Sequence, residues 1–387
     1  MFTALFRRLC SRNSRTPRKT PMSVRRSFRP RLEALEDRTV PSTFNVTNLL
    51  DSGTGSLRAA IASANANPGA DTVAFAPALT GTITLKTGQL NITGSLTIQG
   101  PGADALTVSG NNASRVFNVA AGTTDQISGL TITNGYMATP GNGGAGIHNL
   151  GSLTLTNVAV KNNFAQGMDI ALGGGIFNSG TLTIQNSTIT GNSAGYTRVF
   201  GPGDVGSVTG LGGGIYNVGA LTVQNSTLSG NTAGGWGLGG AVMNGAGLWV
   251  GIFPKVWKGA SATFTGCTIT GNSATTGGGI YVTSTGSALT ALLNASATTL
   301  LVQSAAYFVT GQTIQIDNEQ MTVTKVDTLR NTLTVTRGVN NTTAAAHLSG
   351  ARVMGLSTCL DAFTLAHLID NSAPSNANIY GLYLTCP

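Results

Sequence analysis

The chain has 387 residues, of which 53 are glycine, 41 % are apolar and only 9 % are charged. Its net charge of +8 would suit a nucleic-acid-binding protein, but residues 1–43 hold 11 of the 22 basic side chains and only 3 of the 14 acidic ones. The rest of the chain therefore carries 11 bases and 11 acids, and this balance argues against nucleic acid as a partner of the folded part.

Residues 1–43 are rich in Arg, Ser and Pro, which predicts a disordered basic leader. It has no apolar core of signal-peptide length, and no run of 18 apolar residues that could span a membrane occurs in the chain. Met22 is an alternative start. The string LEALEDRTVPS at 32–42 resembles the N-terminal signature of large surface proteins of planctomycete-type bacteria, which implies export. The alternative is a short amphipathic helix without a targeting role.

A helix is predicted after a first strand at residues 44–48. Ser56 is its expected N-cap, and Leu57, Ala60, Ile61 and Ala64 form one apolar stripe. Residues 72–134 then contain short, closely spaced strand patterns. Because the first coil of a solenoid leaves an open apolar end, we expect this helix to cap the coils that follow.

Three segments of 22 residues align without a gap, at 144–165, 173–194 and 212–233. A fourth copy is divided between 239–244 and 259–274, and a fifth begins at 277–282. A fixed short period indicates a solenoid. Each unit contains three short β-rich runs, and alternation places Leu182 and Ile184 inward, so the repeat predicts a parallel β-helix of 22-residue coils.

The strings GGGIFN at 173–178 and NSTITGNSA at 186–194 resemble the repeats of chlamydial polymorphic outer membrane proteins and related right-handed bacterial β-helices. Residues 44–75 are similar to the first segment of many secreted bacterial β-helix proteins. The resemblance covers about residues 44–286. It implies right-handed coils and export, and says little about activity.

Insertions of unequal length separate the repeats, at 166–172, 195–211, 234–238 and 245–258, and we expect them to form external loops. The last one contains Trp249, Phe253 and Trp257, which either form a contact surface or fold back on the coil.

Residues 287–357 break the period with longer alternating strands and predict a small inserted β module. The run from 309 to 347 resembles a small β module found in phage structural and bacterial surface proteins. The repeat resumes at 363–373, so the predicted domains are a leader (1–43), the β-helix with its cap (44–286), the module (287–357) and a last coil (358–387). Cys359 and Cys386 either form a disulfide after export or remain thiols, while Cys267 takes the slot of Ser187 and Ser226 and should be buried.

No catalytic, metal or cofactor residue is predicted. Glycoside hydrolases need a pair of carboxylates, but between Asp125 and Asp317 the chain has no Glu and only Asp169 and Asp204, both in insertions. His148, His347 and His367 lie in separate segments without a nucleophile–base pattern. The alternative left open is a carbohydrate-active β-helix enzyme, a polysaccharide lyase or hydrolase, that uses loop residues.

Two asparagine ladders and one stripe emerge from the alignment. The asparagines should hydrogen-bond from coil to coil in a structural role: Asn149, Asn178, Asn217 and Asn244 in one ladder, and Asn163, Asn192, Asn231 and Asn272 in the other. The stripe should point outward and is a candidate ligand-binding surface, with self-stacking or cover by the insertions as the alternative: His148, Phe177, Tyr216, Met243 and Tyr281.

These patterns predict an exported, non-catalytic protein with a structural or adhesive role. We expect it at the cell surface, in the outer membrane or in the extracellular medium. Its expected partners are glycans or other cell-surface proteins.

Overall fold

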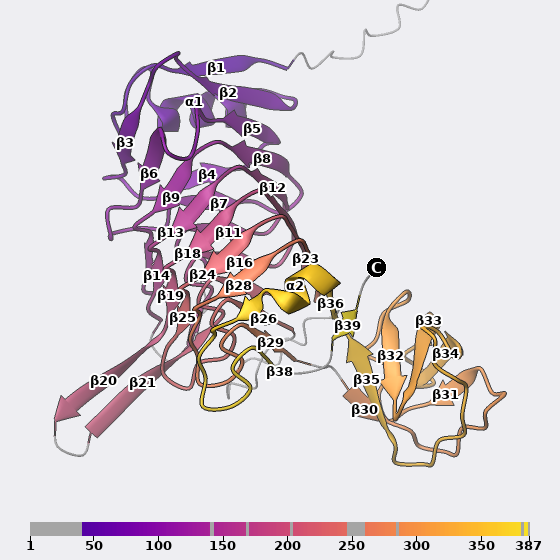
Figure 1. The fold of residues 1–387 in the computed structure, drawn as a ribbon. Coiled ribbons are helices and arrows are strands. Elements are labelled where there is room, and N and C mark those ends of the chain that lie inside the picture. Colours follow the sequence, from indigo (N-terminus) through magenta and orange to yellow (C-terminus); the bar gives the residue numbers. More distant parts are fainter. Residues whose placement is uncertain are drawn as a thin grey trace, which may run out of the picture. The chain divides into compact units, whose positions relative to one another are not determined.

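A computed structural model describes residues 41–139, 143–167, 170–201, 204–245, 260–283, 286–380 and 383–385. The described residues belong to one compact unit in which parallel sheets stack coil upon coil (Figure 1). The fold is the expected parallel β-helix.

Three long sheets, here named A, B and C, form the walls of the solenoid, and every strand in them pairs with its neighbours in parallel. Sheet A contains β1 (Thr43–Val46), β2 (Asp71–Phe75), β5 (Leu96–Gln99), β8 (Thr124–Ser128), β12 (Ser152–Thr156), β17 (Thr181–Gln185), β23 (Ala220–Gln224), β27 (Ser261–Thr265), β36 (Thr358–Leu360) and β39 (Leu384–Thr385). Sheet B contains β3 (Gly81–Thr84), β6 (Leu106–Ser109), β9 (Thr131–Thr133), β13 (Ala159–Lys161), β18 (Thr188–Thr190), β24 (Thr227–Ser229), β28 (Thr268–Thr270) and β37 (Leu368–Ile369). Sheet C contains β4 (Leu90–Ile92), β7 (Phe117–Val119), β11 (Ile147–Asn149), β16 (Ile176–Asn178), β22 (Ile215–Asn217), β26 (Val242–Asn244), β29 (Ile280–Val282) and β38 (Ile379–Tyr380).

Two smaller sheets widen the middle coils. One is formed by β10 (Tyr136–Met137), β14 (Phe164–Ala165), β19 (Ser193–Ala194) and β25 (Thr232–Ala233). The other joins β15 (Ile170–Leu172) to the antiparallel hairpin of β20 (Tyr196–Gly201) and β21 (Asp204–Leu211).

The alternation in the repeats produces the core. Leu182 and Ile184 on β17 are fully buried, whereas Thr183 between them is partly exposed. The same inward columns continue through the coils, so each unit buries its apolar face against the units above and below it.

The corners of the coils need a left-handed backbone, which explains why Asn and Gly recur in the repeat. Asn186 and Asn225 have φ angles of 49° and 47° at the corner between sheets A and B, and Gly266 occupies that corner with a φ of 64°. Among residues other than glycine, asparagine tolerates this region best.

A full turn is longer than the 22-residue repeat. Leu153 pairs with Leu182, 29 residues later, and Leu182 pairs with Leu221, 39 residues later. The difference arises because the insertions are part of each turn. The expectation that insertions form only external loops is therefore wrong for 166–172 and 195–211, whose strands β15 and β21 pair with each other.

The N-terminal end is closed by α1 (Leu57–Ala66), which packs against β1, β2 and β4. Ser56 is its N-cap, and its side chain accepts a hydrogen bond from Ala59 N–H. Leu57, Ala60, Ile61 and Ala64 are buried, as the stripe predicted.

Between β29 and β36 the chain forms a six-stranded, largely antiparallel sheet with an apolar core of its own. Its strands are β30 (Gly286–Ala288), β31 (Thr299–Leu301), β32 (Thr313–Ile316), β33 (Glu319–Asp327), β34 (Thr332–Thr336) and β35 (Arg352–Leu356). We propose 287–357 as the bounds of this module. The coils then resume through β36, the short helix α2 (Ala362–Ala366), β37 and β38.

Candidate functional site

The predicted stripe is a continuous ladder on sheet C. His148 pairs with Phe177, Phe177 with Tyr216, Tyr216 with Met243, and Met243 with Tyr281. The middle of this ladder is not a surface, however, because Phe177, Tyr216 and Met243 are only 6 %, 4 % and 0 % exposed. For these three residues the expectation of an accessible ligand-binding surface is wrong, although they lie on the outer side of sheet C and not in the core of the coils.

The cover comes from the insertions. Ile170 and Leu172 of β15, together with Leu211 and Leu238, pack over the ladder and form a second apolar cluster outside sheet C. Burial accordingly raises the pKa of Tyr216 to about 12. These contacts use the middle of the ladder for packing, which was the alternative interpretation of the stripe.

At the N-terminal end of the ladder, the His148 ring lies edge-on to Phe177 with 4.8 Å between ring centroids. Burial, with a smaller contribution from the charge of Arg115, lowers the pKa of His148 to about 4. This histidine is therefore neutral at physiological pH.

The ladder is accessible at its C-terminal end. Tyr281 stacks on Tyr380 with 4.7 Å between ring centroids and 8° between the ring planes, and Tyr380 is 41 % exposed. Tyr380 extends the ladder by one coil through the pairing of β29 with β38. The sequence alignment missed it because the module separates the two tyrosines along the chain.

The first asparagine ladder runs through the buried interior of the sheet C corner. Asn149 donates through Nδ2 to Asn178 Oδ1, Asn178 to Asn217, and Asn217 to Asn244, each at 2.7 Å. All four side chains are fully buried. Each amide links one coil to the next.

The second asparagine ladder extends beyond the four residues of the alignment. Bonds of 2.9, 3.0 and 2.9 Å join Asn163, Asn192, Asn231 and Asn272, and Asn272 donates onward to Asn371 at 2.8 Å. The ladder therefore bridges the module, which separates Asn272 from Asn371 in the sequence.

Two early-coil carboxylates occupy core columns. Asp125 pairs in register with Leu153, and Asp71 pairs with Leu96. Burial raises the pKa of Asp125 more than its hydrogen bonds from Thr123 and Leu96 N–H lower it. Asp125 accepts a hydrogen bond from Leu96 N–H, and Asp71 accepts one from Ser42 N–H. Both carboxylates therefore have a structural role in holding neighbouring strands.

A charged network inside the module was not foreseen. Arg337 forms a two-point salt bridge with Glu319, with both N···O distances at 2.6 Å, and the buried His347 contacts Asp317 at 2.8 Å and Glu319 at 2.9 Å. Although burial alone raises the pKa of Glu319, hydrogen bonds from Arg337, Ala345 N–H and His347 and the Arg337 charge lower it to about 2. Arg337 also donates to the carbonyls of Asn294, Ala297 and Ala345, so the network fastens the module's loops to β33.

The cysteines take different roles. Cys267 is fully buried and free, and its Sγ lies 3.3 Å from Val223 O. It occupies the position that Ser226 has one coil earlier, where the serine hydroxyl accepts a hydrogen bond from Ser187 N–H. Cys359 is disulfide-bonded. Its expected partner Cys386 lies outside the described residues, so that pairing stays a prediction.

Several residues named from the sequence cannot be placed. Asp169, Trp249, Phe253 and Trp257 lie outside the described residues, as does the side chain of Asp204. In the described ranges, no three or more His, Cys, Asp or Glu side chains are grouped so that they could hold a metal ion. None of the described helices has the length and apolarity needed to cross a lipid bilayer.

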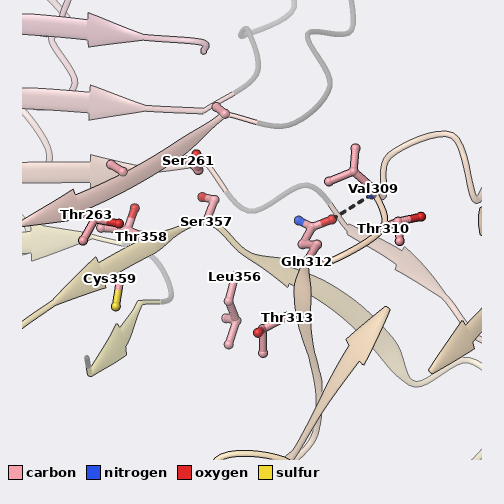
Figure 2. A pocket seen from close by; sticks show the side chains of 13 residues that line it. Ser261, Thr263, Val309, Thr310, Gln312, Thr313, Leu356, Ser357, Thr358 and Cys359 are labelled. Atoms are coloured by element: carbon pink, nitrogen blue, oxygen red, sulfur yellow. Dashed lines mark hydrogen bonds between the residues drawn. The ribbon is translucent and has the colours of Figure 1, made fainter. Parts of the chain in front are cut away.

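A cleft of about 390 Å³ opens where the module meets the coils (Figure 2). Its walls come from three segments: 260–263 at β27, 309–313 in the loop before β32, and 356–359 at β36. None of the thirteen lining residues is Asp, Glu, Lys, Arg or His. The described lining is therefore uncharged, with threonine, serine and glutamine as its polar side chains.

The comparisons with known proteins agree with this architecture. A family model described as a right-handed beta helix region matches residues 94–296. No curated protein matches the sequence.

Proposed function

Since the chain belongs to the right-handed β-helix family, we propose that it is an exported, non-catalytic protein of the cell surface or extracellular medium with a structural or adhesive role. The family match covers residues 94–296, which include the middle coils, and supports the architecture. The proposed export rests on the N-terminal resemblance at 32–42. The proposed role rests on the low charge of the coils and on the outer face of sheet A.

One observation carries the non-catalytic part of the proposal. Between 143 and 283, Lys161 is the single Asp, Glu, Lys or Arg whose side chain the structure describes. Acid–base cleavage of a polysaccharide needs at least two positioned ionisable groups. A long run of coils with one described charge favours a scaffold.

The outer face of sheet A supports adhesion by neutral contacts. Thr154, Thr183, Thr222 and Thr263 form one column in register, and all four are partly exposed. Successive strands of a sheet lie about 4.8 Å apart, so the column offers hydroxyl groups at a regular spacing. Such an array can hydrogen-bond a polyhydroxylated surface without any charge on either partner.

Fractionation of the source cells, with intact-mass analysis of the recovered chain, tests the proposal. We expect the protein in the medium or surface fraction with the basic leader removed. Recovery from the cytoplasm with all 43 leader residues attached would refute export.

The purified chain should also bind cell-surface polysaccharides without shortening them. Polysaccharide cleavage that disappears in an Asp169→Asn or Asp204→Asn variant would refute the non-catalytic role.

A further inference from the structure

We propose that the cleft between β27, β36 and the 309–313 loop of the module binds a short neutral saccharide. The proposal deepens the adhesive role and rests on it, because it names a ligand class and a place where that ligand is held. The volume of about 390 Å³ falls within the range of roughly 300–1,000 Å³ that small-ligand sites occupy.

The lining offers hydrogen-bonding groups that the protein itself does not use. In the described part of the chain, the hydroxyls of Ser261, Thr263, Thr310 and Thr313 make no hydrogen bond to protein. A hydroxyl both donates and accepts, which matches the donor–acceptor pattern of sugar hydroxyls.

Gln312 is held so that its amide nitrogen is available. Its Oε1 accepts from Val309 N–H at 3.2 Å, and its backbone N–H donates back to Val309 O at 3.2 Å. Figure 2 shows this side chain extending from the loop with the amide nitrogen on the side of Ser357. Within the described chain, Nε2 has no hydrogen-bond partner, so two oriented N–H donors face the cleft.

The absence of charge among the described lining residues selects against ionic ligands. A carboxylate or phosphate that enters such a site loses hydration without gaining a counter-charge, whereas a neutral hydroxyl exchanges water for protein hydrogen bonds. Val309, whose side chain is partly exposed, adds apolar surface against which the C–H face of a pyranose ring can pack.

The lining of the cleft comes from two parts of the fold, the coils and the module. Thr263 belongs to the repeated coils, whereas Gln312 and Thr313 belong to the module. Thr222, one coil earlier in the same column, is not part of the cleft. The module therefore converts one position of a repeated threonine column into a three-sided site.

Ligand-observed NMR titration of the purified full chain tests this assignment. The probes are maltose, cellobiose and N,N′-diacetylchitobiose, with digalacturonic acid as the charged counterpart. We expect at least one neutral disaccharide to bind, and to bind more tightly than digalacturonic acid.

Two substitutions alter the cleft while keeping its shape. Thr263→Val removes one hydroxyl and keeps the β-branched side chain, and Gln312→Glu keeps the oxygen that accepts from Val309 N–H while replacing the N–H donors. Each should weaken neutral-sugar binding about two- to tenfold, as expected for the loss of one hydrogen bond. Thr227→Val is the matched control, because Thr227 is a partly exposed threonine on β24 of sheet B, outside both the cleft and the threonine column of sheet A. It should bind like the wild type, and circular dichroism and unfolding midpoints check that each variant is folded.

The outcomes separate this site from the proposed function. Equal sugar binding by Thr263→Val, Gln312→Glu and Thr227→Val, or no binding of any neutral disaccharide, overturns the site and leaves the localisation result untouched. The opposite combination is also informative. If the cleft variants lose sugar binding but the protein is recovered from the cytoplasm, the site is supported and the exported role is refuted.

Discussion

Replacing Asn231 by alanine tests whether the asparagine ladders hold the coils together. Asn231 Oδ1 accepts from Asn192 N–H at 3.1 Å and from Asn192 Nδ2 at 3.0 Å. Its Nδ2 donates to Ile189 O and to Asn272 Oδ1, both at 2.9 Å. Asn231→Ala therefore removes four hydrogen bonds from a fully buried site.

The expected cost follows from these four bonds. A buried hydrogen bond contributes about 1 kcal/mol net, so the substitution should lower the free energy of unfolding by about 4 kcal/mol. Some partners keep another bond, since Asn192 Nδ2 also donates to Val160 O at 2.9 Å. Asn192 N–H has no other acceptor in the described chain, and leaving it buried and unpaired adds to the cost.

The assay is guanidinium unfolding of the full chain followed by circular dichroism. The midpoint should fall strongly while the slope with denaturant stays unchanged, because the surface exposed on unfolding is nearly the same. Asn118→Ala is the matched control. Asn118 lies on β7 of sheet C, and its Nδ2 makes a single exposed bond to Asn91 Oδ1 at 3.3 Å, so the loss of this bond should cost less than about 1 kcal/mol.

A drop of less than about 1 kcal/mol for Asn231→Ala, equal to that of the control, would refute the reasoning. The ladder would then be a consequence of the repeat and not a source of its stability. A large drop for both variants would point instead to a general sensitivity of the coils to substitution.

Three further predictions concern the corner, the cap and the module. Asn186, at a φ of 49°, should tolerate Gly with little change, whereas Asn186→Val should destabilise the chain by roughly 1–2 kcal/mol in the same unfolding assay; equal stabilities would contradict the steric argument. Ile61→Ala, on the buried face of α1, should cost about 2–5 kcal/mol, whereas Ser63→Ala on the exposed face should be neutral, and a neutral Ile61→Ala would mean that α1 does not plug the first coil. The pKa of Glu319 falls from 4.5 to about 2 on folding, so its carboxylate adds stability that is complete above pH 4.5 and disappears as pH falls toward 2. Hydrogen exchange of β33 amides between pH 5 and pH 2.5 should show this loss in the wild type and not in Glu319→Gln, and an identical pH dependence in both would contradict it.

The sequence predicted those features that depend on the repeat. Partner positions such as Leu182 and Leu221, or Asn192 and Asn231, occupy the same slot in aligned units, and parallel stacking puts equal slots next to each other. The capping helix α1 could also be predicted, because the spacing of Leu57 and Ile61 depends on helix geometry alone.

The features that were missed depend on segments without a repeat. The insertions differ in length, so no alignment relates Ile170 or Leu238 to the ring of Tyr216 that they help to cover. The module contacts join residues that are distant in sequence, such as Glu319 with Arg337 and His347, and single-sequence patterns carry no signal for such pairs. Tyr380 was missed for the same reason, since the module separates it from its stacking partner.

The two sides of the cleft also differ in whether the sequence predicts them. The threonine column that contains Thr263 follows from the alternation in the repeats. The opposite wall depends on the position of the loop around Gln312, which only the three-dimensional structure supplies.

The asparagine bond from Asn272 to Asn371 has a consequence for how such chains can change during evolution. The coils on either side of the module stay in register although Asn371 lies 99 positions after Asn272 in the sequence. The stacking of these coils therefore does not depend on the sequence of the module between them. The entropy cost of closing such an excursion grows only logarithmically with its length. The chain at this point can therefore gain, lose or replace a module at a small entropy cost, while the asparagine bond keeps the coils on both sides in register.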